Sequence, residues 1–225
     1  MNSISLCCTS TGSNINILNK MLESAQGFDE VILHINGNKQ SNESYKFPNN
    51  VKFLDTPELL TAAEGFNFVI SNASNLWVCP ACDDDFFHSD KLSQLMSWFK
   101  TADLNGIDII YFPIFCGNER DGYTEQALLT PTYDGLRKQN MLPFSCFYRK
   151  SLWDKIGGYN INLPFSDWHF WLKALKSGVT LYRWNNPIYY FRTGIEERLS
   201  DRERKAKDFE LSKQQLLDKV DAYEF

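Results

Sequence analysis

Residues 76–85 read Leu-Trp-Val-Cys-Pro-Ala-Cys-Asp-Asp-Asp, an apolar run that ends in three consecutive carboxylates. The apolar part, residues 76–81, has the length and composition of a buried β-strand. Three adjacent carboxylates repel one another unless a cation offsets their charge, so the end of this strand is a candidate site for a divalent metal. A solvated acidic cap on the helix expected from Asp90 is the alternative, and the triplet alone leaves both open.

Strand-like and helix-like segments alternate around this stretch. Short apolar runs predict strands at residues 4–8, 31–35 and 51–54, and apolar residues at helical spacing predict helices at 15–27, 59–73 and 90–102. This alternation predicts a mainly parallel sheet wound by right-handed crossovers. Ligands bind beyond the carboxyl ends of the strands in such sheets, and this position favours the metal interpretation of the Asp triplet.

The second half of the chain continues the pattern less regularly. Strands are expected at residues 107–114, 144–148 and 181–191, helices at 151–156 and 167–176, and an irregular excursion at 117–140. The expected fold class is therefore α/β, with a single domain over residues 1–199. The charged tail over residues 200–225 has apolar residues at helical spacing, which predicts a helix packed on this domain. A helix that binds a partner or a membrane surface is the alternative.

The composition is that of an ordinary globular protein, because 43% of the 225 residues are hydrophobic and 23% are charged. The formal net charge of −5 argues against a protein whose main task is to grip nucleic-acid backbone. Residues 1–11 do not resemble a signal peptide, and the apolar run at 107–116 is too short to cross a bilayer. Six cysteines without such a signal are typical of reduced thiols, so we expect a cytoplasmic protein without a transmembrane segment.

Several motifs, taken in chain order, resemble those of the family 2 glycosyltransferases of the GT-A fold. They are Cys8-Thr9-Ser10-Thr11, residues 30–38 (Glu-Val-Ile-Leu-His-Ile-Asn-Gly-Asn), Asn67, Asp83-Asp84-Asp85, residues 147–159 (Phe-Tyr-Arg-Lys-Ser-Leu-Trp-Asp-Lys-Ile-Gly-Gly-Tyr), residues 165–172 (Phe-Ser-Asp-Trp-His-Phe-Trp-Leu) and residues 187–192 (Pro-Ile-Tyr-Tyr-Phe-Arg). The similarity covers roughly residues 3–195. It implies a Rossmann-like GT-A domain that transfers a sugar from a nucleotide diphospho-sugar. The implied reaction is metal-dependent and inverting, with a UDP-sugar as the default donor and a hydroxyl group, by default on a glycan, as the acceptor.

The same resemblance assigns the donor site. It places six residues at the donor: Thr9, Thr11, Asn36, Asn67, Asp83 and Asp84. The implied metal ligands are Asp85 and then Asp84, which would hold Mn²⁺ or Mg²⁺, with Asp83 nearer the ribose. Cys82 aligns with the first Asp of some members, so the register of the triplet stays open by one residue. Asn36 stands where an acidic residue usually contacts the base, and this departure leaves the nucleotide open.

Asp167 resembles the catalytic base of the family. A carboxylate at this position would take a proton from the acceptor hydroxyl, whereas a simple cap on the helix that follows is the alternative. Thr193-Gly194 stands where many members carry a His that completes the metal site. The residues implied on the acceptor side are Ser145, Arg149, Trp168 and Arg192.

Rival interpretations stay open. One is a non-catalytic module of the same fold that binds a saccharide or a nucleotide. Another is glycosylation of a polyanionic acceptor such as modified DNA, which the net charge does not favour but the basic residues at 198–207 keep open. Cys79-Pro80-Ala81-Cys82 has the spacing of a redox or zinc pair, but no second pair of ligands follows, so two core-strand cysteines are expected. The three histidines, expected to be structural, are His34, His88 and His169.

Overall fold

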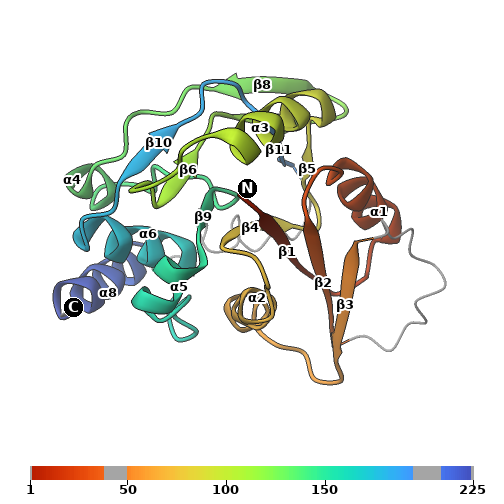
Figure 1. Cartoon of the computed structure of the whole chain (residues 1–225). Helices are drawn as coiled ribbons and strands as arrows, with labels where there is room; N and C mark the ends of the chain where they lie inside the picture. Colours follow the sequence, from red (N-terminus) through yellow and green to blue (C-terminus); the bar gives the residue numbers. More distant parts are fainter. Residues whose placement is uncertain (1, 38–49, 195–208, 224–225) are drawn as a thin grey trace.

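Within the described residues, seven strands form the central sheet of this computed structural model, which describes residues 2–37, 50–194 and 209–223 (Figure 1). The strands are β1 (Ile4–Ser10), β2 (Glu30–Asn36), β3 (Val51–Thr56), β4 (Trp77–Cys82), β6 (Ile109–Tyr111), β9 (Phe147–Arg149) and β10 (Leu181–Arg183). Their order across the sheet is β10-β6-β9-β4-β1-β2-β3. Neighbouring strands run parallel except at β9, which is antiparallel to both β4 and β6. The expected α/β class with a mainly parallel sheet is confirmed.

Helices cover both faces of the central sheet (Figure 1). One face carries α1 (Ile15–Ser24) and α3 (Ser89–Thr101). The other face carries α2 (Ala62–Ser71), α5 (Lys150–Ile156), α6 (Ser166–Lys176) and α8 (Phe209–Asp221). Because successive side chains of a strand point to opposite faces, Leu6 and Cys8 of β1 join the first core and Cys7 joins the second. Burial on both faces explains why β1 is continuously apolar.

A second sheet begins directly after the Asp triplet. In the described residues it consists, in spatial order, of β5 (Phe86–Phe87), β11 (Tyr189–Arg192), β7 (Ile114–Asn118) and β8 (Gly122–Gln126). The prediction of a single strand at residues 107–114 is therefore wrong, because this run is divided between β6 and β7. Pro113 stands at the break, where it has no N–H to donate to a strand ladder. The excursion expected at 117–140 likewise contains β8 and the short α4 (Tyr133–Leu136).

The carboxyl-terminal helix α8 lies against α6. Leu216, Leu217 and Val220 are buried in the same core as α6. Lys176 of α6 extends this contact, because its Nζ donates to the carbonyl oxygens of Val220 and Tyr223, both at 2.8 Å. The helix expected in the tail is present, and it packs through its apolar face.

The expected domain boundary between residues 199 and 200 lies outside the described residues, as do the basic positions at 198–207. Among the helices of the described ranges, none is long and apolar enough to cross a membrane.

Candidate active site

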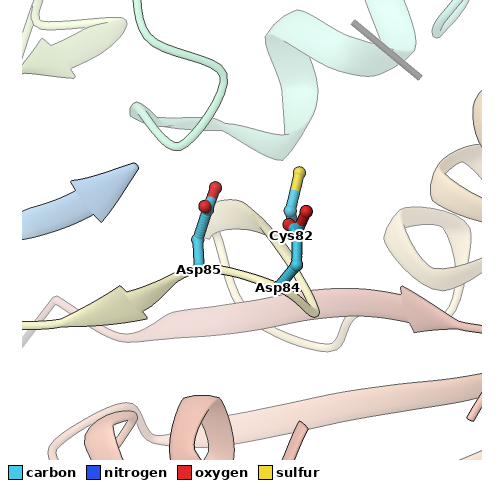
Figure 2. Close-up of side chains that lie close together, drawn as sticks. All are labelled: Cys82, Asp84 and Asp85. Atoms are coloured by element: carbon cyan, nitrogen blue, oxygen red, sulfur yellow. The ribbon is translucent and has the colours of Figure 1, made fainter. Parts of the chain in front are cut away.

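The turn between β4 and β5 brings a thiol and two carboxylates together. One ligand atom from each of Cys82, Asp84 and Asp85 lies within 4.8 Å of the other two. Figure 2 shows the three side chains pointing to the same side of the turn. Asp83 is held by a different contact, since its Oδ2 accepts a hydrogen bond of 2.5 Å from Ser10 Oγ at the end of β1. The carboxyl ends of two adjacent parallel strands therefore meet here, at the edge where the sequence predicts a ligand.

Asp85 joins the two sheets. Its side chain is buried, with 2% of the residue exposed. Asp85 Oδ1 accepts from the backbone N–H of Arg192 at 2.9 Å, and Oδ2 accepts from the Tyr189 hydroxyl at 3.1 Å. The Tyr189 oxygen in turn accepts from the backbone N–H of Cys82 at 3.2 Å. Asp84 is only half-buried, so it is the more accessible carboxylate of the pair.

A chain of charges runs beside this turn. The Arg192 guanidinium donates to Glu119 Oε2 at 3.2 Å and, through Nη1, to the Asp84 carbonyl at 3.4 Å. Lys20 Nζ lies 3.0 Å from the other oxygen of Glu119. Burial by itself raises the pKa of Glu119, but the hydrogen bond from Lys20 and the charge of Arg192 bring this pKa down to about 2. Arg192, expected on the acceptor side, thus lies against the acidic turn, where a guanidinium suits a phosphate group.

Thr9 points away from the acidic turn. Its hydroxyl lies 2.8 Å from Nδ1 of His34, whose Nε2 lies 2.9 Å from the Thr56 hydroxyl. Because Thr56 donates its own proton to the Glu58 carbonyl, it accepts from Nε2–H of His34, and Thr9 donates to Nδ1. Burial lowers the pKa of His34, so this ring is neutral at pH 7 and structural. The hydroxyl at the turn belongs instead to Ser10, which the sequence analysis did not select.

The side chains of the two asparagines expected at the donor each form two hydrogen bonds with the backbone of one distant residue. Asn36 donates to the Leu60 carbonyl at 2.9 Å and accepts from the Leu60 N–H at 2.7 Å. Asn67 makes the same pair of bonds with Tyr159, both at 2.8 Å. Asn36 therefore fixes the approach to α2, and Asn67 fixes the Gly-Gly-Tyr turn after α5. Thr11, the remaining donor residue of the β1 turn, is exposed.

Asp167 lies in the first turn of α6, which begins at Ser166. The residue before the helix, Phe165, is the one non-glycine in the described ranges with a positive φ, at 53°. Such strained backbone clusters at functional sites. Asn140, which the sequence analysis missed, donates to Asp167 Oδ2 at 2.9 Å. Asp167 does not cap the helix, because the cap position is Phe165 and no side chain caps there.

The other acceptor-side residues are distributed through the fold. Ser145 is 1% exposed, and its carbonyl accepts from the Cys79 thiol of β4 at 3.3 Å. Trp168 is 4% exposed and belongs to the core. Arg149 pairs with Trp77, five residues before Cys82 and so roughly 16 Å away along β4 at about 3.3 Å per residue. The structure therefore does not bring Arg149 to the acidic turn, because antiparallel β9 carries it to the opposite edge.

The Cys79/Cys82 pair does not form a chelating pair. Two strand residues three positions apart point to opposite faces of a sheet. Cys79 is buried, and burial raises the pKa of its thiol well above the usual range, as expected for a core cysteine. Cys82 also belongs to β4, but it is half-buried and its sulfur lies in the carboxylate cluster.

Comparisons with known proteins bear on the fold. No protein family matches the sequence, and no curated protein matches it. Among solved structures, S. aureus TarS 1–349 in complex with UDP-GlcNAc superposes with a TM-score of 0.68 at 14% identity, over 98% of this chain and 71% of that chain. A longer TarS chain gives a TM-score of 0.64 at 14% identity, and this chain spans 42% of it.

A mannosyltransferase superposes with a similar score. The mannosyltransferase PcManGT from Pyrobaculum calidifontis, in complex with GDP-Man and Mn²⁺, gives a TM-score of 0.64 at 13% identity. The match covers 99% of this chain and 65% of that chain. These superpositions extend over nearly the whole chain. The chain therefore has the fold of the GT-A glycosyltransferases.

Proposed function

We propose that this chain is a glycosyltransferase that moves a sugar from a nucleotide diphospho-sugar to an acceptor hydroxyl with the help of Mn²⁺ or Mg²⁺. The observation that carries the proposal is the cluster of Cys82, Asp84 and Asp85 at the carboxyl end of the central strand β4. In an open α/β sheet this edge is where ligands bind. UDP-GlcNAc and GDP-Man in the structural neighbours support the class of donor.

The residues of the turn fit a divalent metal. Carboxylate oxygens are the ligands that Mg²⁺ and Mn²⁺ prefer, and the half-buried Asp84 is open to one. A bound metal would stabilise negative charge on the departing nucleoside diphosphate. Asp85 holds the turn against β11, and the Arg192 guanidinium, which lies beside the turn, would bind a phosphate oxygen. Asp83 would remain with Ser10, nearer the ribose.

Asp167 is the proposed base of an inverting transfer. Its carboxylate takes the proton of the acceptor hydroxyl while that oxygen attacks the anomeric carbon, and the bond to the diphosphate breaks at the same carbon. Asp167 lies in the first turn of α6, at the positive end of the helix dipole. The Asn140 amide donates to Asp167 Oδ2 and so helps to orient the carboxylate.

UDP is the default nucleotide and a glycan the default acceptor. The net charge of −5 does not favour a DNA acceptor. The six cysteines, each in a described range, are not joined in disulfides, which supports the expected cytoplasmic location.

A donor panel tests the function. The protein is incubated with Mn²⁺ and each of several UDP- and GDP-sugars, and release of the nucleoside diphosphate is measured with and without simple saccharide acceptors. The transferase proposal predicts slow release with one donor class and faster release when an acceptor is added. Tight binding of a donor without any release would instead support the non-catalytic module.

A further inference from the structure

We propose that Cys82 supplies a sulfur ligand to the metal of this site, so that the site binds thiophilic divalent cations in preference to Mg²⁺. The inference deepens the proposed function and rests on it for its biological role. Metal binding itself can be measured without any transfer reaction.

The geometry places the Cys82 sulfur among the ligand atoms. Its Sγ and one oxygen each of Asp84 and Asp85 lie within 4.8 Å of one another. Bonds of about 2.0–2.2 Å to oxygen and about 2.3 Å to sulfur bring ligand atoms to within about 4.5 Å across one metal. The three side chains point to the same side of the turn (Figure 2), so Cys82 and Asp84 can share one metal while Asp85 keeps its hydrogen bonds to Arg192 and Tyr189.

Cys82 differs from the core cysteines of the same chain. Cys7, Cys8, Cys79 and Cys146 are fully buried, and burial raises the pKa of each thiol well above its usual range. Such thiols are inert toward metals because the thiolate is the ligand form. The Cys82 thiol is half-buried at the end of β4 and lies beside two carboxylates that can share a cation.

A sulfur donor changes which metal a carboxylate site prefers. Oxygen-only sites suit Mg²⁺ and Mn²⁺, whereas thiolate ligands favour softer cations such as Co²⁺, Zn²⁺ and Cd²⁺. When the metal binds, the Cys82 thiol releases its proton to solvent and the sulfur donates an electron pair to the cation. Mn²⁺ can still bind through the carboxylates, whereas Mg²⁺ gains little from sulfur.

The test follows Co²⁺ binding to the whole chain by its sulfur-to-metal charge-transfer absorption in the near ultraviolet. The wild type and a control, Cys116→Ser, are expected to show the band, since Cys116 is a half-buried cysteine outside the cluster. Cys82→Ser is expected to lose the band and to bind Cd²⁺ at least about tenfold more weakly, with Mg²⁺ affinity nearly unchanged. Cys82→Asp is expected to gain Mg²⁺ affinity. Thermal unfolding of each variant checks that it folds.

Two results would overturn the inference. One is Co²⁺ binding to the wild type without a sulfur band, a result that needs no variant. The other is an equal band in wild type and folded Cys82→Ser. Failure of the inference and failure of the function are distinguishable, because Mn²⁺-dependent transfer without a sulfur band contradicts only the ligand role of Cys82. A sulfur-to-Co²⁺ absorption band in a protein that transfers sugar from none of the donors contradicts only the proposed glycosyltransferase function.

Discussion

Thr9 and Ser10 are adjacent in β1, and their hydroxyls lie on opposite faces of the sheet. Thr9 contacts His34 on the α2 side, and Ser10 contacts Asp83 at the acidic turn. The two-residue period of a strand allows only one of two neighbours to face a given side. The apolar run predicts a strand that ends at Cys8, whereas β1 extends two residues further, to Ser10. The alternation of side chains along the strand therefore could not be used to select Ser10.

Changing Ser10 to Ala tests this contact. The variant removes a hydroxyl that donates to a carboxylate, and hydrogen bonds to charged groups contribute about 1.5–3 kcal/mol. We expect the free energy of unfolding to fall by roughly this amount in urea titrations, together with a loss of donor affinity. Ser13→Ala, an exposed change in the same turn, is the control and should change little. Equal stability of the two variants would show that the Asp83 carboxylate does not depend on Ser10.

Changing Asp167 to Asn tests the proposed base. Asparagine keeps the size of the side chain but cannot accept the proton. General-base catalysis contributes about a hundred- to ten-thousand-fold in rate, so kcat should fall by that factor. Donor affinity and thermal stability should stay close to wild type, because Asp167 does not cap α6. A turnover number within a few-fold of the wild type would remove Asp167 from the mechanism.

At the scale of elements, the sequence predicts which segments are strands and helices better than it predicts how strands pair. The apolar runs of β1, β2 and β4 are continuous because these strands are buried on both faces, and this signal is local. The direction of β9 is not local, and it decides that Arg149 lies at the edge opposite the acidic turn. The hydrogen bonds between the Asn67 side chain and the Tyr159 backbone could not be foreseen either, because the two residues are far apart in the sequence.

The position of the Asp triplet at the end of a central strand could be predicted from the sequence. Carboxylates that directly follow a short apolar strand must lie at the edge of the sheet where that strand ends, so their position follows from the strand direction alone. Which carboxylate faces outward depends on Tyr189 and Arg192, about a hundred residues later in the chain. The resemblance to the family 2 glycosyltransferases implies Asp85 before Asp84 as metal ligand, whereas the burial and the hydrogen bonds of Asp85 favour Asp84.

The close approach of α2 to β1 gives a prediction at this scale. A Cβ at Gly65 would lie 2.7 Å from Thr9 Oγ1. Gly65→Ala should therefore destabilise the protein by about 1–3 kcal/mol, whereas the same change in an uncrowded helix stabilises by up to about 1 kcal/mol. The measurement is denaturant unfolding of Gly65→Ala alone and combined with Thr9→Ala, which should recover part of the loss by removing the crowded atoms. Stabilisation by Gly65→Ala alone would contradict this packing.

At the scale of the whole molecule, the acidic turn joins the central sheet to the second sheet. Asp84→Asn and Asp85→Asn should therefore separate metal binding from stability. Asp84→Asn should weaken Mn²⁺ binding at least about tenfold and leave the unfolding midpoint nearly unchanged. Asp85→Asn should lower the free energy of unfolding by about 1–3 kcal/mol, because the Asn amide nitrogen cannot accept one of the two hydrogen bonds that link β11 to the turn. Calorimetric metal titration and urea unfolding measure the two effects, and equal losses in both variants would contradict the division of roles.

The central claim is that the acidic turn holds the metal for glycosyl transfer, and one measurement tests it most directly. Nucleoside diphosphate release from the preferred donor is followed in the presence of acceptor, first with EDTA, then after excess Mn²⁺ is restored. The wild type should be inactive in EDTA and regain full activity with Mn²⁺, whereas Asp84→Asn should need a much higher Mn²⁺ concentration to reach the same rate. Full activity of the wild type in EDTA, or an unchanged Mn²⁺ requirement in Asp84→Asn, would contradict the account.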